Sequence, residues 1–324
     1  MLNRKFITFN SLTNHSRDVG TNFRKTRMKR ILGTLIAILI SQIGFSQDYQ
    51  SEFQKYCQTN DTINQLKILK KWQSENAKDA ELFTSYFNYH FMKSRQEVLA
   101  LTTDQPNGES LVLKDSLNQN AGFLGSKIHY NQTELKKGLD KIDEGIKLYP
   151  NRLDMRFGKI YALGQIPDWE NFTKEIIKTI EYSAKNHNNW TWTNNEKYNG
   201  NEKEFLLSIQ DYQYQLYNTG DDVLLKNMRE IAEKVLEYYP NHVESLSNLS
   251  VTYLLTGEYD KGIEPLLRAE KINPKDYIVL GNIAQGYKLK GDKIKAIEYY
   301  EKTAEYGDEK AKEYAKQQIT ELKQ

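Results

Sequence analysis

Two stretches of 34 residues in the last third of the chain repeat one another, and this repeat constrains the fold more than any other feature. When Pro240 is aligned with Pro274, residues of the same class fall at the same offsets. The matched pairs are Leu246 with Leu280, Leu249 with Ile283, Ser250 with Ala284, Tyr253 with Tyr287, Gly257 with Gly291, Gly262 with Ala296 and Leu266 with Tyr300. A repeat of this length is typical of a helix-turn-helix unit that buries its apolar face only by stacking on further copies.

Each matched class has a structural role in such a stack. Small residues let helix backbones approach closely, and they stand at Ser250, Gly262, Ala284 and Ala296. The paired tyrosines are large enough to fill the space between neighbouring units. Gly257 and Gly291 fall between the two helices of their units, where a positive φ costs glycine little. The pattern therefore predicts two antiparallel helices in each repeat.

These units resemble the tetratricopeptide repeat. In the first unit the matching residues are Leu246, Leu249, Ser250, Tyr253, Gly262, Leu266, Ala269 and Pro274. In the second they are Leu280, Ile283, Ala284, Tyr287, Ala296 and Tyr300, with Thr303 in place of a small apolar residue and no closing proline at Glu309. The resemblance implies an all-α fold, an α-solenoid of stacked helix pairs. It also implies a noncatalytic protein that binds a partner protein or peptide.

Helical spacing of apolar residues predicts more degenerate pairs in the rest of the chain. We expect N-terminal helices over residues 47–93, with a break at Asn60-Asp61-Thr62 and Thr62 as a cap, and degenerate helical repeats over 133–239. The sequence Tyr149-Pro150-Asn151 recurs as Tyr239-Pro240-Asn241, and proline just beyond a helix is a stop signal. The two clear units span 240–307, and residues 308–324 are expected to form a helix that caps the open end.

Helical spacing is lost between residues 94 and 132. Gln105-Pro106-Asn107-Gly108 has the composition of a turn, and Leu111 and Leu113 alternate with other residues. Two glycines then interrupt residues 121–128. We expect a small β-hairpin inserted within one helical unit. Such an insertion either decorates a binding face or is tolerated there without a function.

Residues 186–201 form a polar and aromatic loop that contains Trp190 and Trp192. Two exposed indoles would provide a surface for a glycan or another small ligand. Alternatively, the loop folds back and buries the indoles against the helices. We favour burial, because exposing two tryptophans is costly.

The first 46 residues have the features of a leader. Met28-Lys29-Arg30 is a basic start, an apolar run follows from Ile31 to Ile40, and Ser46 precedes the expected cleavage site. This pattern predicts a secretory signal peptide, with Met28 as a candidate start of translation. The apolar run is shorter than the roughly 20 residues that a membrane-spanning helix requires. We therefore expect an exported protein of bacterial type, periplasmic or extracellular, with no stable membrane span after cleavage.

The charge balance argues against nucleic-acid binding. The leader holds eight of the 45 basic residues and one of the 43 acidic residues, so 37 basic and 42 acidic residues remain after it. An acidic chain without a clustered basic face lacks the footprint of a nucleic-acid-binding protein. The single cysteine, Cys57, cannot form an internal disulfide, and we expect it to be a half-buried side chain on the first helix.

Sequence motifs of catalysis are missing from the chain. It contains no glycine-rich phosphate loop, GxSxG, His-Glu-x-x-His or CxxC. The five histidines are dispersed, with no pair at the spacing of metal ligands: His15, His90, His129, His187 and His242. The sequence thus names no catalytic, cofactor-binding or metal-binding residue, and we expect no cofactor.

The resemblance to tetratricopeptide repeats implies a concave face formed by the first helix of each unit. Mapped onto this sequence, the partner groove would consist of Glu244, Ser247, Val251, Leu254 and Leu255 in one unit and Ile278, Gly281, Gln285, Lys288 and Leu289 in the next. These residues are mostly apolar and neutral. Ser247 stands where the repeats that clamp a terminal carboxylate carry a lysine. Two hypotheses remain open: an adaptor for a protein partner, or a binder of a small ligand or glycan through Trp190 and Trp192.

Overall fold

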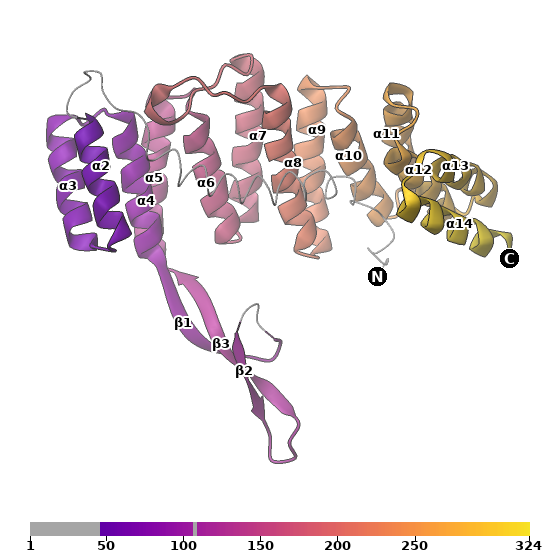
Figure 1. Ribbon diagram of the computed structural model, residues 1–324, viewed down its shortest axis with the longest axis horizontal. Helices are drawn as coiled ribbons and strands as arrows, with labels where there is room; N and C mark the ends of the chain where they lie inside the picture. Colours follow the sequence, from indigo (N-terminus) through magenta and orange to yellow (C-terminus); the bar gives the residue numbers. More distant parts are fainter. Residues whose placement is uncertain (1–45, 106–108) are drawn as a thin grey trace. The chain divides into compact units, whose positions relative to one another are not determined.

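The computed structural model describes residues 46–105 and 109–324. The predicted leader lies outside this range except for Ser46, where the first described helix begins. The described residues contain thirteen α-helices and one small β-sheet, and they divide into two compact units (Figure 1). The N-terminal unit contains residues 46–167 and 189–199, and the C-terminal unit contains residues 168–188 and 200–324. The predicted fold, helix pairs with a small β insertion, is confirmed.

The helices of the N-terminal unit are α2 (Ser46–Gln58), α3 (Thr62–Glu75), α4 (Ala80–Ser94), α5 (Gln132–Leu148) and α6 (Leu153–Gln165). Aromatic residues dominate the core between α2, α3 and α4, where Trp72 is fully buried and stacks on Tyr49. A second core joins α4, α5 and α6 around Phe87, Ile142 and Met155. Asp61, rather than Thr62 as predicted, caps α3, because its carboxylate accepts a hydrogen bond from the backbone N–H of Asn64.

Close packing of α5 on α4 depends on two glycines that the repeat pattern did not single out. A Cβ at Gly145 would lie 2.8 Å from Cβ of Phe83, and a Cβ at Gly138 would lie 3.2 Å from Cβ of His90. Real side chains essentially never approach as closely as the first of these distances. The two glycines therefore let the backbone of α5 lie against the side chains of α4.

The insertion is a three-stranded antiparallel sheet, which we call the arm: β1 (Arg95–Thr102), β2 (Ser110–Lys114) and β3 (Asn120–Tyr130). The strand order is β1-β3-β2, and the arm extends away from α4 and α5. The predicted hairpin corresponds to β2 and β3, and the sequence pattern missed β1. Alternation is weak in β1 because nearly all of its side chains are exposed, so burial selects no apolar face.

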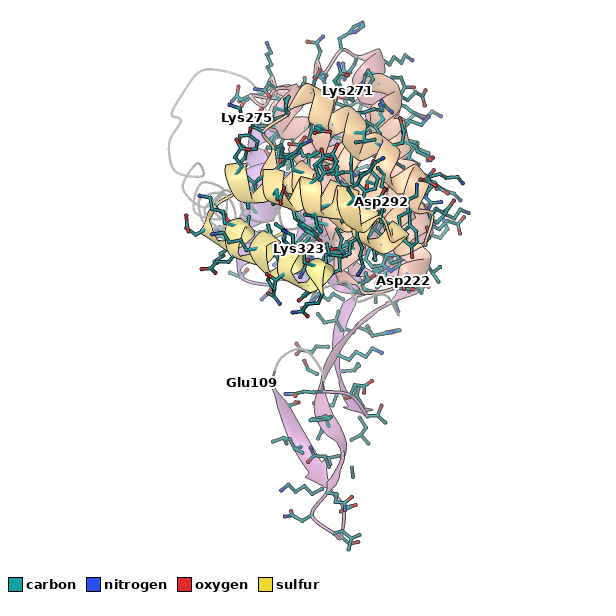
Figure 2. The ribbon with its side chains drawn as sticks, turned by 90° about the vertical axis from the view of Figure 1, so that its right-hand side faces the viewer. Glu109, Asp222, Lys271, Lys275, Asp292 and Lys323 are labelled. Atoms are coloured by element: carbon teal, nitrogen blue, oxygen red, sulfur yellow. The ribbon has the colours of Figure 1, made fainter. Side chains whose placement is uncertain are left out.

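The C-terminal unit consists of eight α-helices: α7 (Trp169–Lys185), α8 (Glu202–Asn218), α9 (Leu225–Tyr238), α10 (Val243–Leu255), α11 (Tyr259–Ile272), α12 (Tyr277–Lys290), α13 (Lys293–Tyr306) and α14 (Glu309–Lys323). A short 3-10 turn, Asp222–Leu224, precedes α9. From α9 onward each helix packs against the next one in the chain, as the repeat pattern predicts. Exposed lysines such as Lys271, Lys275 and Lys323 point outward from this unit (Figure 2).

The small residues of the repeat make the contacts that were predicted for them. A Cβ at Gly262 would lie 2.7 Å from Cγ of Leu254, and Ala284 and Ala296 are fully buried. Gly257 and Gly291 have φ values of 81° and 88°, the left-handed conformation that glycine adopts without a steric penalty. The paired α10–α11 and α12–α13 hairpins are therefore built on the residues that define the repeat.

Helix α14 ends the C-terminal unit as the expected capping helix. Asp308 caps its first turn, and Ala315 and Gln318 are its buried side chains. None of the helices in the described ranges is long and apolar enough to cross a membrane.

Candidate functional site

The predicted groove residues lie on α10 and α12, but the structure separates them into two groups. Four of the ten side chains are buried: Ser247, Val251, Leu254 and Gln285. The other six are partly exposed: Glu244, Leu255, Ile278, Gly281, Lys288 and Leu289. The predicted groove therefore includes positions that a partner cannot reach without a rearrangement of the helices.

Leu254 is the clearest of these corrections. Its side chain is fully buried, and its Cδ2 approaches both Gly262 on α11 and Gly286 on α12. Gly281 faces α13, since a Cβ there would lie 3.6 Å from Cγ2 of Thr303. The register assumed from the family resemblance thus assigned residues of the helix-helix contacts to the groove, because a single sequence does not show how far α10 is covered by its neighbours.

The accessible part of the predicted groove combines apolar side chains with one charge at each end. Leu255, Ile278 and Leu289 are half-buried, and Glu244 and Lys288 keep 45% and 29% of their side-chain surface exposed. Lys288 is held by α14: its Nζ donates to Oε1 of Gln318 and lies 3.2 Å from Oε2 of Glu321. These five residues are what we call the α10–α12 surface.

A buried polar seam between α8 and α10 was missed by the sequence analysis. Nε2 of Gln210 donates to Oγ of Ser245 at 3.1 Å, and Nδ2 of Asn248 donates to Oε1 of Gln210. Nδ1 of His242 lies 2.9 Å from the same Ser245 hydroxyl. Burial lowers the pKa of His242, although the carboxylates of Glu244 and Glu202 oppose this shift.

Gln213 lies one turn beyond Gln210 on α8 and is fully buried. Neither its Nε2 nor its Oε1 has a hydrogen-bond partner among the residues that the structure describes. Buried amides without partners are costly, and ordered water commonly satisfies them. On α12, by contrast, Gln285 accepts a hydrogen bond at 2.7 Å from the hydroxyl of Tyr300, whose pKa is raised by burial.

The aromatic loop folds back onto its own unit. Trp190 is 2% exposed and lies beside the guanidinium of Arg156, and the half-buried Trp192 packs edge-on against Phe157. Thr191 forms backbone bridges to Arg152 and Lys197. Burial of Trp190 agrees with the favoured interpretation of this loop. The pair does not present two open indole faces to a ligand.

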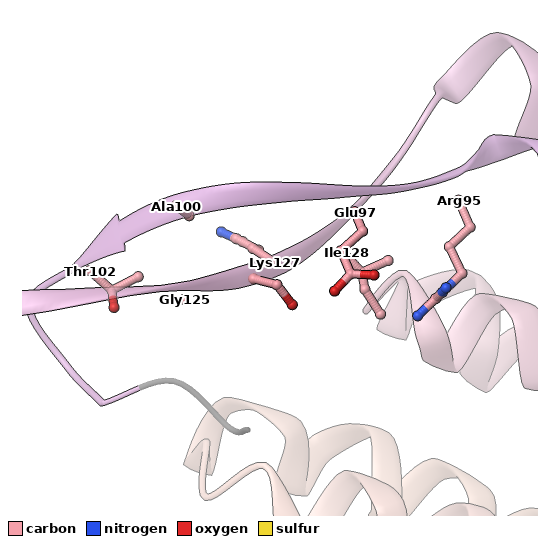
Figure 3. A pocket seen from close by; sticks show the side chains of 8 residues that line it. Arg95, Glu97, Ala100, Thr102, Gly125, Lys127 and Ile128 are labelled. Carbon is pink, nitrogen blue, oxygen red and sulfur yellow. The ribbon is translucent and has the colours of Figure 1, made fainter. Parts of the chain in front are cut away.

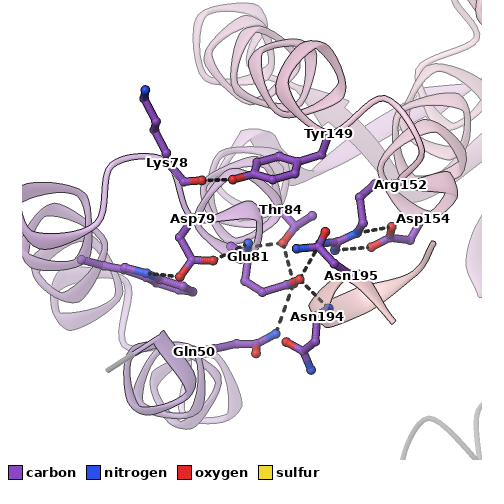
Figure 4. A network of polar contacts seen from close by, with 11 residues as sticks. Gln50, Lys78, Asp79, Glu81, Thr84, Tyr149, Arg152, Asp154, Asn194 and Asn195 are labelled. Carbon is purple, nitrogen blue, oxygen red and sulfur yellow. Dashed lines mark hydrogen bonds and ion pairs between the residues drawn. The ribbon is translucent and has the colours of Figure 1, made fainter. Parts of the chain in front are cut away.

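A buried charge network fixes this loop to α4 and α6 (Figure 4). Arg152, 1% exposed, places Nη1 2.7 Å from Oε1 of Glu81 and donates from Nη2 to Asp154 at 2.8 Å. The backbone N–H of Asn194 donates to the same Glu81 oxygen at 2.7 Å. Burial acts to lower the pKa of Arg152, but the two carboxylates outweigh it and raise the pKa overall. The network joins structural elements, and its two central side chains, Arg152 and Glu81, are buried.

The arm carries an open hollow of about 460 Å³. Its lining includes Arg95, Glu97, Lys127 and Ile128 near the base of the arm (Figure 3). The charged groups are few and of mixed sign, so the hollow has no strong preference for an anion or a cation.

The remaining histidine, cysteine and carboxylate side chains of the described residues form no metal cluster. Across residues 46–105 and 109–324, no three His, Cys, Asp or Glu side chains gather as a metal site would require. Cys57 is exposed on α2 rather than half-buried as expected, and desolvation by neighbouring atoms raises the pKa of its thiol. His90 pairs with Glu134 at 2.8 Å, a contact between α4 and α5.

Residues 231–264 match the family described as tetratricopeptide repeat, a segment that covers part of α9, all of α10 and the start of α11. No match was found among curated proteins. Among solved structures, "YrrB: a TPR protein with an unusual peptide-binding site" is 14% identical, with 77% of this chain and 97% of that chain covered and a TM-score of 0.39. A tetratricopeptide repeat protein from Parabacteroides merdae ATCC 43184 is 10% identical, with coverages of 86% and 98% and a TM-score of 0.33. For MamA the identity is 15%, the coverages are 56% and 93%, and the TM-score is 0.34. The family match at residues 231–264 confirms the resemblance drawn from the sequence.

Proposed function

We propose that this chain, which carries a tetratricopeptide repeat at residues 231–264, is an exported, noncatalytic scaffold that binds a partner protein or peptide through its α10–α12 surface. The observation that carries the proposal is the set of half-buried apolar side chains Leu255, Ile278 and Leu289 on alternate helices of one compact unit. Apolar positions of this kind are the usual anchors of an interface, and polar neighbours at its rim set its orientation.

The two ends of this surface differ in charge. Glu244 is partly exposed near the start of α10, and Lys288 is partly exposed near the end of α12. A partner segment with a basic group beside Glu244, an acidic group beside Lys288 and apolar side chains beside the three apolar residues would match this surface. Lys288 already forms an ion pair with Glu321. We therefore expect it to set the orientation of a bound partner more than to increase the affinity.

The hydrogen bonding of buried polar groups supports a noncatalytic role. Several buried polar groups of the C-terminal unit are amides and hydroxyls joined to one another, such as Gln210 with Ser245 and Gln285 with Tyr300. Such pairs specify helix packing, and they offer neither an activated nucleophile nor a general base.

Binding is tested by substitution on the proposed surface. The double variant Leu255→Glu with Ile278→Glu places two charges among its apolar side chains and should abolish capture of the partner from envelope extract after crosslinking. Ile294→Glu on α13 is the matched control, because Ile294 is 82% exposed in the same unit but lies outside the proposed surface. Equal capture by both variants would reject the surface. Leu254 is unsuitable for this test, because a charge at a fully buried position would unfold the unit.

Export is tested separately, because it rests on the sequence of residues 1–46. The protein recovered from the cell envelope or medium should begin at Gln47. A cytoplasmic protein that retains the apolar run Ile31 to Ile40 would contradict export without affecting the binding proposal.

A further inference from the structure

We propose that His242 is a proton-sensitive switch, whose protonation reverses a buried hydrogen-bond chain between α8 and α10 and offsets the charge of Glu244. The reversal concerns the interior of the C-terminal unit and needs no partner. The offset of Glu244 rests on the proposed function, because Glu244 belongs to the α10–α12 surface. The two parts are therefore tested by separate measurements.

The seam between α8 and α10 is a continuous chain of hydrogen bonds. Nδ2 of Asn248 donates to Oε1 of Gln210, and Nε2 of Gln210 donates to Oγ of Ser245 at 3.1 Å. The same hydroxyl lies 2.9 Å from Nδ1 of His242. Gln210, Ser245 and Asn248 are at most 3% exposed, so bulk water does not compete for these bonds. The direction of each bond therefore depends on its neighbours in the chain.

Glu244 determines which ring nitrogen of neutral His242 carries the hydrogen. Nε2 lies 3.2 Å from Oε2 of Glu244, and an ionised carboxylate has no hydrogen to donate. The ring hydrogen therefore lies on Nε2, because the carboxylate would repel a lone pair there. Nδ1 is then an acceptor, and it takes the single hydrogen of the Ser245 hydroxyl. With neutral His242, every donor in the chain thus points from Asn248 toward the ring.

Protonation of His242 reverses this direction. It places a hydrogen on Nδ1, so the Ser245 hydroxyl must accept there and donate its own hydrogen to another group. Gln210 offers that acceptor when its amide rotates and exchanges the positions of Nε2 and Oε1. Nε2 of Gln210 then faces Asn248, whose amide must rotate as well to present Oδ1. One proton on the ring therefore turns two buried amides, one on α8 and one on α10.

The surroundings of His242 set the pH range of the switch. Burial is the main influence and lowers the pKa of the ring, which places the change below pH 6.5. The charged groups that face the ring are Glu244 on α10 and Glu202 in the first turn of α8, and both favour the protonated form. Because Ser245 is fully buried, its hydroxyl serves this chain and does not reach a substrate.

Glu244 connects the switch to the α10–α12 surface. Its side chain is 45% exposed, and an imidazolium 3.2 Å away offsets the charge that a basic group of the partner would contact. In the capture assay, the wild type should therefore retain less partner below the pKa of His242 than at pH 7, and His242→Gln should remove this difference. A wild type that captures equally at both pH values would contradict the effect on Glu244. A wild type that captures nothing at either pH would instead count against the proposed function.

NMR of the full-length chain, with ¹⁵N in its histidine rings and side-chain amides, tests the reversal without a partner. At neutral pH the ring of His242, assigned with His242→Gln, should carry its hydrogen on Nε2. On acidification, the amide signals of Gln210 and Asn248 should shift with the same midpoint as the ring. The amide of Gln285, which accepts from Tyr300 outside the chain, should not follow that midpoint.

Ser245→Ala separates the relay from the electric field of the charged ring. It removes the hydroxyl that links the ring to Gln210, so the ring should still titrate while the signals of Gln210 and Asn248 no longer follow it. Ser247→Ala is the matched control, because Ser247 is buried on the same helix but lies outside the chain, and it should leave the coupling intact. Amides that still follow the ring in Ser245→Ala would overturn the reversal. In the wild type, a neutral ring with its hydrogen on Nδ1, or amides that do not follow the ring, would overturn it without any variant.

Discussion

Nη1 of Arg152 lies 2.7 Å from Oε1 of Glu81, and both side chains are almost fully buried. Glu81 is in the first turn of α4, and Arg152 immediately precedes α6. Because the same glutamate accepts the backbone N–H of Asn194, one ion pair holds two helices and the aromatic loop together. The indoles of this loop are thus part of the internal packing of the N-terminal unit.

Arg152→Leu should destabilise the N-terminal unit by about 3–5 kcal/mol, because Glu81 would remain buried without its partner. The free energy of unfolding, measured by urea denaturation, checks this value. The double variant Glu81→Gln with Arg152→Leu removes both charges and should lose less stability than Arg152→Leu alone. If the double variant is the less stable of the two, the pair is not coupled in this way.

Trp190→Ala should lower the free energy of unfolding by about 3–5 kcal/mol, since it removes a buried indole and leaves a cavity. Trp192→Ala should cost less, because Trp192 is only half-buried. Thermal unfolding of the two variants checks this order. An unchanged melting curve for Trp190→Ala would mean that the loop does not pack as described.

Glu134 provides a pH-dependent contribution to the N-terminal unit. Hydrogen bonds from Lys137 and His90, together with nearby Lys93, lower its pKa to about 2. A lowered carboxyl pKa adds stability above the unfolded-state value near 4.5, and this stability is lost as the pH falls toward 2. Glu134→Gln should therefore cost about 1 kcal/mol at pH 7, a value reduced for solvent screening at a partly open site. The cost should vanish near pH 2, and a cost that is the same at both pH values would contradict the assignment.

His242 should make the C-terminal unit sensitive to mild acid. Burial lowers its pKa below the ordinary value of 6.5, so below pH 6.5 the unfolded chain binds a proton that the folded chain does not. The free energy of unfolding should then decrease between pH 7 and 5.5. His242→Gln should reduce this decrease, as measured by urea titrations at the two pH values. An equally steep decrease in the variant would assign the effect to other groups.

The repeat was predictable because its residues have one role wherever they occur: Gly257 must turn the chain, and Ala296 must be small. The groove was less predictable. The side chain of Leu254 could face either a binding partner or Gly286 of the neighbouring helix. Which of the two it faces depends on the distance between α10 and α12, and this distance cannot be derived from a single sequence. The seam of Gln210 and Asn248 was missed for the same reason, since polar residues on a helix indicate solvent until a partner helix is placed beside them. Strand β1 was missed because exposure on both sides removes the alternation that identifies a strand.

Two glycines on α12 test the helix stack most directly. A Cβ at Gly286 would lie 2.9 Å from Cγ1 of Ile263, whereas a Cβ at Gly281 would make an ordinary 3.6 Å contact with Thr303. Gly286→Ala should therefore destabilise the C-terminal unit by about 1–3 kcal/mol, because it overpacks the contact with α11. Gly281→Ala should stabilise it by about 0.5–1 kcal/mol, because alanine favours a helix. The decisive measurement is the free energy of unfolding of both variants. Changes of opposite sign are the predicted result, and changes of the same sign would contradict the stack of helix pairs on which the proposed scaffold depends.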